Sequence, residues 1–252
     1  VAGDPLPQCV IADAAEYRTS SETWRDGLGA LCDENLVRQH GLRGTDLVEP
    51  YHDRVREAVA ASLDPTVSRR LHRRLAEAIE RWDTGRTNML ARHWLAASES
   101  SQAKKYVRTA AAEARAKLAF DRAAQLYRTA LELEVDETSK PDLLRALGDC
   151  LADSGRSAQA AEAYQQAAGL VPHSEAMHLQ HLAAAQYLRG GRIAKGMEVM
   201  DGVLKTVGLA IAPTPRRATL NVAKRLAWLK VRGTKFTERP PESLSESDQR
   251  VR

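Results

Sequence analysis

The stretch DRAAQLYRTALEL, residues 121–133, returns 37 residues further on as AQAAEAYQQAAGL, residues 158–170. The matched positions hold small residues around one tyrosine: Ala123, Ala124, Tyr127 and Ala130 in the first copy, and Ala160, Ala161, Tyr164 and Ala167 in the second. A third copy follows, because Gly191-Arg192 lies 36 residues after Gly155-Arg156, and Met200 there takes the place of the tyrosine. These offsets are close to the 34-residue period of a helix–turn–helix repeat.

The residue types at these positions favour stacked helix pairs. Small alanines let two helices approach closely, and the larger residue fills the gap beside them. No single unit can bury its apolar face alone, so neighbouring units must stack. We therefore predict a mainly all-α protein with tetratricopeptide-like helical-hairpin repeats over residues 135–212. The predicted pairs are helices 143–154 and 157–170, closed at Gly155, and helices 175–189 and 193–207, closed at Gly190 and Gly191.

Residues 64–134 are predicted to be a helical connector with an irregular first repeat, formed by helices 102–119 and 121–133. The connector opens with Asp64 as N-cap and Pro65 at the first helical position. Its first helix carries a cluster of four arginines: Arg69, Arg70, Arg73 and Arg74. This cluster could contact a phosphate or an acidic partner. Glu77 and Glu80 lie one turn further on, which favours a solvated, salt-bridged helix face.

Residues 1–63 differ in pattern from the rest. Two helices, 8–17 and 22–35, are predicted, the second with Ser21 as N-cap. Two short extended segments, 36–39 and 46–51, flank a loop with two glycines, which suits a hairpin. Helix, helix, hairpin is the layout of a winged-helix-like segment. Four acids on the second helix oppose one arginine there, so phosphate repulsion argues against DNA binding by this helix.

The C-terminal region is basic. Residues 213–233 are predicted to contain a helix, and residues 234–252, rich in Ser, Glu and Arg, an exposed linker. The cations in and just after the helix have no acid between them: Arg216, Arg217, Lys224, Arg225, Lys230, Arg232 and Lys235. Such a helix could lie on an anionic membrane surface. It could equally cover the end of the helical stack, and docking within the protein is the interpretation that we favour.

The bulk composition limits the class of protein. Of 252 residues, 43% are hydrophobic and 28% charged, which excludes general disorder. No apolar run approaches the roughly 18 residues of a membrane-spanning helix, and no signal peptide is visible, so we expect a cytoplasmic protein. The net charge of +4 is spread among acids and does not indicate nucleic-acid binding. Three widely spaced cysteines, Cys9, Cys32 and Cys150, fit neither a disulfide framework nor a zinc site.

No motif in the sequence carries a complete catalytic site. His52-Asp53-Arg54 has the order of a kinase catalytic loop reversed, and the required asparagine is replaced by Ala58. No phosphate-binding glycine loop of the Walker or dinucleotide type is present. His178 and His181 share a helix face, but a metal site needs further ligands, so a solvated pair is preferred. We expect no catalytic, cofactor or metal residue in this chain.

Several stretches together resemble one family, the large bacterial signalling ATPases. They are VAGDPL at 1–6, YHDRVREAV at 51–59, LHRRLAEAI at 71–79, ARHW at 91–94 and LAFDRAAQLY at 118–127. In that family a serine/threonine protein kinase is commonly fused to a signal-transduction ATPase of the AAA-like class, and a winged-helix-like segment and tetratricopeptide-like repeats follow. The resemblance covers about residues 1–235 and is most specific at Tyr51-His52-Asp53-Arg54.

The resemblance implies a non-catalytic regulatory segment whose kinase and ATPase modules precede Val1. ATP and Mg²⁺ would belong to those modules and not to this chain. The implied partners are proteins: the ATPase module in cis and an unidentified protein in trans, with neither nucleic acid nor membrane expected. An alternative is the helical-repeat arm of an ATPase-type transcriptional activator, which a DNA-binding domain after Arg252 would favour. A free-standing enzyme is the third and least favoured hypothesis.

Overall fold

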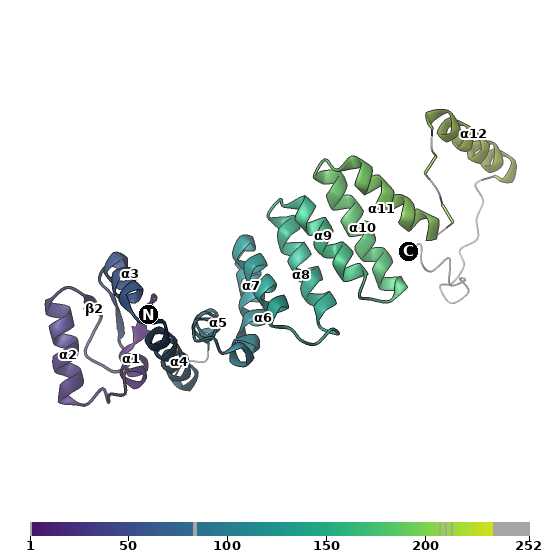
Figure 1. The fold of residues 1–252 in the computed structure, drawn as a ribbon. Helices are drawn as coiled ribbons and strands as arrows, with labels where there is room; N and C mark the ends of the chain where they lie inside the picture. Colours follow the sequence, from purple (N-terminus) through teal and green to yellow (C-terminus); the bar gives the residue numbers. More distant parts are fainter. Residues whose placement is uncertain (1, 83–84, 207, 210, 213, 234–252) are drawn as a thin grey trace. The chain divides into compact units, whose positions relative to one another are not determined.

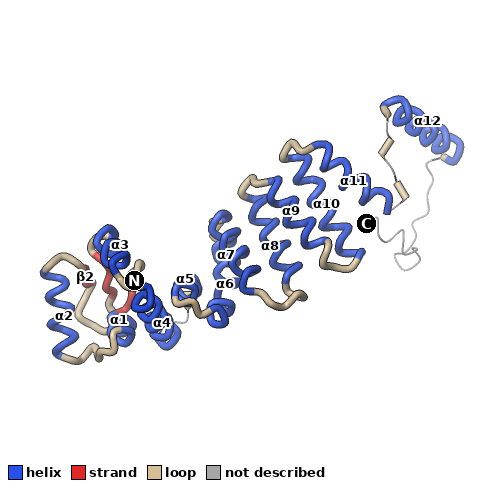
Figure 2. Tube along the Cα trace, in the orientation of Figure 1, coloured by secondary structure: helices blue, strands red, loops and turns tan. Residues whose placement is uncertain are grey.

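The computed structural model describes residues 2–82, 85–206, 208–209, 211–212 and 214–233 (Figure 1). The protein is mostly helical: helices make up 72% of the described residues, which contain twelve helices and a small three-stranded sheet (Figure 2). The prediction of a mainly α-helical protein is therefore confirmed. The chain divides into two compact units, Val1–Val135 and Asp136–Arg252, which are described separately below.

The first unit begins with the sheet and the two helices that cover it. The antiparallel strands run in the order β1 (Leu6–Pro7), β3 (Leu47–Pro50), β2 (Val37–Gln39), with α1 at Gln8–Ala14 and α2 at Glu22–Asp33. Their small core consists of Ala12, Trp24, Leu28 and Val48. The Ser21 hydroxyl accepts a hydrogen bond from the Trp24 backbone N–H at 3.3 Å, so Ser21 caps α2 as predicted. The two-residue strand β1 was not predicted, because Pro5 precedes it and Pro7 is its second residue.

Five further helices complete the first unit: α3 (Asp53–Ser62), α4 (Pro65–Trp82), α5 (Thr87–Ala96), α6 (Ser100–Ala116) and α7 (Phe120–Leu133). Consecutive helices pack from α4 to α7, and α1 packs on α4. Glu80 on α4 joins three of these helices, since its Oε1 accepts hydrogen bonds from the Trp94 indole at 2.9 Å and the Tyr106 hydroxyl at 2.7 Å. Glu80 thus does not belong to the solvated face that the sequence predicted for it.

The second unit is a row of antiparallel helices followed by a separate one: α8 (Lys140–Asp153), α9 (Ser157–Ala168), α10 (His173–Arg189), α11 (Ile193–Thr206) and α12 (Pro215–Arg232). In Figure 1 the first four lie side by side, and α9 packs against both α8 and α10, while α10 also packs against α11. The predicted linker at 234–252, together with Val207 and Pro213, lies outside the described residues.

The residues that the repeat pattern singled out lie in the helix interfaces. Ala123, Ala124, Ala160, Ala161 and Ala167 have no exposed surface, while Tyr127, Ala130 and Tyr164 are buried with at most 6% exposed. Met200 is half-buried, because α11 ends the row. A close approach explains Gly148 on α8: a Cβ atom there would lie only 2.7 Å from the Tyr164 ring. The Tyr164 hydroxyl also donates to Asp149 Oδ1 at 2.7 Å.

The hairpin turns share one geometry in both units. After α8, Gly155 has φ +77°, its N–H donates to Ala152 O, and the next N–H donates to Leu151 O. This pair of bonds is the Schellman motif, whose left-handed residue is usually glycine. Gly191 repeats it after α10 with φ +77°. After α6 the same two bonds form around Leu118, which has φ +60° despite its side chain.

The same motif explains where the expected helix ends were wrong. Glu16 and Asn35 have φ of +63° and +52°, so the helices predicted at 8–17 and 22–35 end at Ala14 and Asp33. Likewise the helix predicted at 102–119 ends at Ala116, before Leu118. Glutamate and leucine rarely adopt the left-handed conformation, so Glu16 and Leu118 gave no sequence signal, whereas Asn35 is of a type that often ends a helix; these ends were placed two or three residues late.

Candidate protein-interaction surfaces

An apolar groove of about 680 Å³ lies in the first unit between α2, the sheet and α3. Its walls include the buried Trp24 and Leu28 on α2 and Val48 on β3. Apolar side chains that are 38–56% exposed also line it: Tyr17, Leu31, Leu36 and Val59. Contiguous exposed apolar surface of this kind marks a site of interaction in soluble proteins. We refer to it as the apolar groove.

One polar atom in the apolar groove is left without a partner. The indole nitrogen of Trp24 is buried and has no hydrogen-bond acceptor within the described part of the chain. A buried donor that is not hydrogen-bonded costs roughly 1–3 kcal/mol. The groove is therefore defined by its apolar walls, because the Trp24 nitrogen itself has almost no surface that a ligand could contact.

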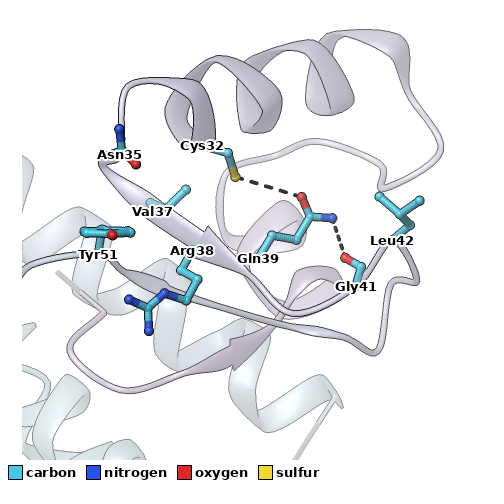
Figure 3. Close-up of a pocket in the computed structure, with 8 residues that line it drawn as sticks. All are labelled: Cys32, Asn35, Val37, Arg38, Gln39, Gly41, Leu42 and Tyr51. Carbon is cyan, nitrogen blue, oxygen red and sulfur yellow. Dashed lines mark hydrogen bonds between the residues drawn. The ribbon is translucent and has the colours of Figure 1, made fainter.

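A second hollow, of about 440 Å³, lies beside the β2–β3 hairpin and is drawn in Figure 3. Its polar groups are engaged with one another: the Gln39 amide donates to Gly41 O, and the Cys32 thiol lies 4.0 Å from Gln39 Oε1. The Arg38 guanidinium lies 4.8 Å from the centre of the Tyr51 ring. These contacts stabilise the hairpin, and they leave no group aimed at a ligand.

The four arginines on α4 divide into two pairs. Arg73 forms ion pairs with Glu77 at 3.4 Å and Glu99 at 3.2 Å. Arg74 is half-buried and pairs with Glu16 at 3.2 Å. Arg69 and Arg70 are exposed. The arginines therefore do not form one phosphate-binding cluster, because two of them are committed to structural ion pairs.

A small polar hollow of about 330 Å³ brings Arg56 of α3 and Arg92 of α5 together beside Gly3. Arg92 pairs with Asp4 at 2.6 Å, and Arg56 pairs with Asp53 at 3.3 Å and Glu57 at 3.5 Å. Because three carboxylates balance the two guanidinium groups, this hollow offers no excess positive charge for an anion.

Two histidines from the stretches of family resemblance meet next to this hollow. Nδ1 of His72 on α4 lies 2.8 Å from Nδ1 of His93 on α5. His93 is fully buried, and burial together with the Arg92 charge lowers its pKa to about 3. Burial also lowers the pKa of His72. Both rings are therefore neutral at pH 7, and one donates to the other. The pair links two helices and is not directed at a substrate.

The exposed faces of α8 and α10 occupy equivalent positions of the repeat but differ in charge. On α8 the face carries Asp142, Arg145 and Asp153. At the positions 36 residues later α10 carries His178, His181 and Arg189. The two predicted histidines are both exposed, in agreement with a solvated pair. Positions that pack are thus alike in the two hairpins, while positions that face outward change.

A polar groove of about 410 Å³ lies on the other side of the same row, lined by α9, α10 and α11. Gln165 in this groove accepts a hydrogen bond from the Tyr187 hydroxyl at 2.8 Å, and the Lys195 ammonium lies 4.7 Å from the centre of the Tyr187 ring. These side chains hold α9, α10 and α11 together, so the groove is a consequence of packing.

Other expected features can be placed briefly. None of the three cysteines, all within the described ranges, forms a disulfide bond; Cys150 is buried, and Cys9 and Cys32 are half-buried. Within the described ranges, no three histidine, cysteine or acidic side chains come close enough to bind a metal ion. None of the described helices combines the length and apolar content needed to cross a bilayer. The acids on α2, Glu22, Asp26, Asp33 and Glu34, are all exposed.

The apolar groove was the feature that the sequence did not reveal. A signal for it existed, because Trp24, Leu28 and Leu31 follow one another at i, i+4 and i+7 on α2. This stripe is too long for the small core beneath it, which is why Leu31 remains 43% exposed.

Comparison with known proteins adds little. No protein-family model matches the chain, and no curated protein does. Among solved structures, BtubC (BKLC) from P. vanneervenii is similar with 17% identity and a TM-score of 0.36, over 88% of this chain and 83% of that one. At that identity and score the likeness supports no conclusion about fold or function.

Proposed function

We propose that this chain is a non-catalytic, protein-interaction segment of a multidomain bacterial signalling ATPase, fused to a serine/threonine protein kinase and working in the cytoplasm. In this proposal the first unit docks on the ATPase module, and the second unit presents its exposed helix faces to a protein in trans. The family resemblance in the sequence supplies the identity of the parent. The surfaces described above supply the mode of action.

The observation that carries the proposal is the apolar groove. It exposes four large apolar side chains around a buried indole donor that lacks an acceptor among the described residues. A surface of this composition is more stable when another protein covers it, because burial removes apolar area from water at about 25 cal/mol per Å². We propose that the ATPase module supplies the apolar side chains that cover the groove.

We further propose that the first 63 residues form a winged-helix-like segment. Two features support this: the strands lie in the order β1-β3-β2, and along the chain α1 and α2 come between β1 and β2, with β2 and β3 forming a hairpin. The exposed acids on α2 argue for a protein partner and against DNA at that helix, because phosphates would be repelled.

For the second unit we propose tetratricopeptide-like repeats. The spacing Leu144-x₂-Leu147-Gly148-x₂-Leu151, followed by Ala160-x₃-Tyr164 and then Pro172, supports this assignment, because it agrees with the repeat pattern apart from two aromatic positions held by leucine. The packing of Gly148 on Tyr164 and the burial of Ala160 give these positions a physical role. Such repeats display a continuous surface made from successive hairpins.

The test is a calorimetric binding measurement between this chain and the ATPase module of the parent protein, prepared separately, with ATP analogue or ADP present. We expect micromolar or tighter binding that depends on the nucleotide. Leu31→Asp or Val59→Asp in the apolar groove should weaken binding at least tenfold, because each introduces a charge into an apolar contact. Binding in neither nucleotide state would refute the proposal, as would ATP turnover by this chain alone.

Two control variants have the same chemistry outside the groove. Leu42 at the hairpin tip is 92% exposed and Val135 after α7 is 87% exposed. Leu42→Asp and Val135→Asp should bind as the unchanged chain does. If the controls weaken binding as much as the groove variants, the ATPase module binds elsewhere.

A further inference from the structure

Helix α11 exposes an apolar face that its counterpart α9 buries. The repeat offset of 36 residues makes Ala161 and Ala168 on α9 equivalent to Met197 and Leu204 on α11. The two alanines are 0% and 7% exposed, because α10 lies against them. Met197, in contrast, is 39% exposed, and Leu204 is only half-buried.

The orientation of α11 shows which side is exposed. Gly196 faces α10, because a Cβ atom there would lie 2.8 Å from the Leu188 side chain. Met197 and Leu204 are about a quarter of a turn from Gly196, and Ile193, 56% exposed, lies about 60° from Gly196 on the same side. We call these three residues the open face of α11. In the repeat, this is the side on which the next helix belongs.

Helix α12, Pro215–Arg232, has the surface needed to cover the open face. All its residues are exposed, including Val222 at 58% and Leu226 at 61%. Helix α10 buries a small and apolar set with a characteristic spacing: Ala176, Leu179, Ala183, Ala184 and Tyr187. If Pro215 takes the place of Ala176, the same spacing gives Ala218, Val222, Ala223 and Leu226 on α12. The apolar stripe of α12 therefore has the pattern by which α10 packs on α9.

The opposite side of α12 is cationic. Arg217 and Lys224 lie on it, whereas Arg225 comes seven residues after Ala218 and lies at the edge of the apolar stripe; Arg232 stacks 4.7 Å from the centre of the Trp228 ring. No acid occurs between residues 215 and 232. A helix with one apolar and one charged side suits the end of a repeat array, because terminal units need a polar outer surface to stay soluble.

Chain connectivity favours α12 over any other occupant. Eight residues, 207–214, separate α11 from α12, compared with four, 169–172, between α9 and α10. Eight residues can span up to about 26–29 Å, well beyond the roughly 8–10 Å between the axes of packed helices. A segment tethered this closely has an effective concentration in the millimolar range, far above that of a second copy in solution.

We propose that α12 packs on the open face of α11 and closes the repeat array as its terminal helix. Its apolar stripe covers Ile193, Met197 and Leu204, Arg217 and Lys224 face water, and the long side chains of Arg225 and Lys230 extend from the edge of the stripe into water. This inference concerns the end of the array and does not depend on what the apolar groove binds. It also implies that a partner in trans contacts the faces of α8 and α10 and not the end of the row.

Hydrogen exchange of the whole chain, followed by mass spectrometry, tests the proposal. An isolated helix of this length is marginal in water, whereas a docked one is protected. We expect the α12 amides to exchange at least tenfold more slowly than an unstructured segment. Met197→Asp on α11 or Val222→Asp on α12 should abolish that protection while α8–α10 remain protected. Asn221→Asp, on the neighbouring but polar side of α12, should leave it unchanged.

Three outcomes would overturn the proposal. The first is unprotected α12 amides in the unchanged chain. The second is protection that disappears on dilution, which would show that a second copy supplies the contact. The third is protection that arises only with phosphatidylserine vesicles, which would assign α12 to an anionic membrane surface. Because Met197→Asp leaves the sequence of α12 intact, loss of protection in that variant cannot come from a change in intrinsic helix propensity.

Discussion

Helices α4–α6 in the first unit and α8–α10 in the second are both antiparallel rows, but different contacts hold them together. In the first row, buried or half-buried polar groups join neighbours: Glu80 binds Trp94 and Tyr106, and His72 binds His93. In the second row, Tyr164 also binds Asp149 and Tyr187 binds Gln165, but the closest contact is steric, with the Tyr164 ring against the bare backbone of Gly148.

The difference teaches how each row responds to change. A buried polar contact depends on the protonation state of its members, since a group that loses its partner inside the protein costs more than the bond itself contributed. A contact between a ring and a glycine depends only on shape, so substitutions that alter volume decide its stability. The first row should therefore be sensitive to pH and the second to side-chain size.

The largest effect is expected from Tyr164→Ala, which would break the steric contact of the second row. Removing a buried aromatic ring costs about 3–5 kcal/mol, because a cavity replaces its contacts. Urea unfolding followed by hydrogen exchange in α8–α10 measures this. Tyr164→Phe is the matched control, since it keeps the ring and loses only the hydrogen bond to Asp149, worth about 1 kcal/mol. Equal losses in the two variants would show that the ring packing is not what holds the row.

A smaller, unit-specific effect is expected from acid. The pKa of His93 is about 3 in the folded protein and that of His72 is also lowered, whereas an unfolded histidine titrates near pH 6.5. Below pH 6.5 the unfolded chain therefore binds more protons than the folded one, so stability is complete above this pH and falls as the pH drops toward 3. The slope is about 1.4 kcal/mol per pH unit for one such histidine, or roughly 2 kcal/mol lost by pH 5.

Hydrogen exchange at pH 7.5 and pH 5, corrected for the intrinsic rate, should show this loss in α4–α6 and not in α8–α10. The histidines of the second unit, His173, His178 and His181, are all exposed. His93→Gln removes the titrating group and should flatten the dependence in α4–α6. An unchanged slope in that variant would mean that other groups cause the acid sensitivity.

The same comparison explains what the sequence could predict. Repeated steric contacts leave a periodic trace, so the alanines and tyrosines of residues 121–133 and 158–170 identified the hairpins and their partners. The polar contacts occur once each, and nothing in the spacing of Glu80, Trp94 and Tyr106 indicated that three helices would bring them together. The apolar groove lies among α2, the β2–β3 hairpin and α3, which meet only in three dimensions, so the sequence offered a signal for its α2 wall alone.

The smallest effect is expected at the Schellman turn, which both units form with the same backbone geometry. Leu118 and Gly155 are equivalent residues of the Schellman turn, with φ of +60° and +77°. The left-handed conformation costs a residue with a side chain about 1–2 kcal/mol. Glycine avoids this cost, but it raises the conformational entropy of the unfolded chain, which lowers stability by roughly 0.5–1 kcal/mol. Leu118→Gly should therefore stabilise the first unit by up to about 1 kcal/mol, measured from the urea midpoint.

Little packing opposes this gain, because the Leu118 side chain is 72% exposed and its removal buries or uncovers little apolar surface. Leu118→Ala separates the two causes, since alanine removes the same exposed side chain but keeps the Cβ atom that is strained in the left-handed region. If alanine stabilised the unit as much as glycine, the turn would not be strained at Leu118. If only glycine raised the free energy of unfolding, Leu118 would be strained in the left-handed conformation. The packing of α6 on α7 would then dictate this turn against the preference of leucine.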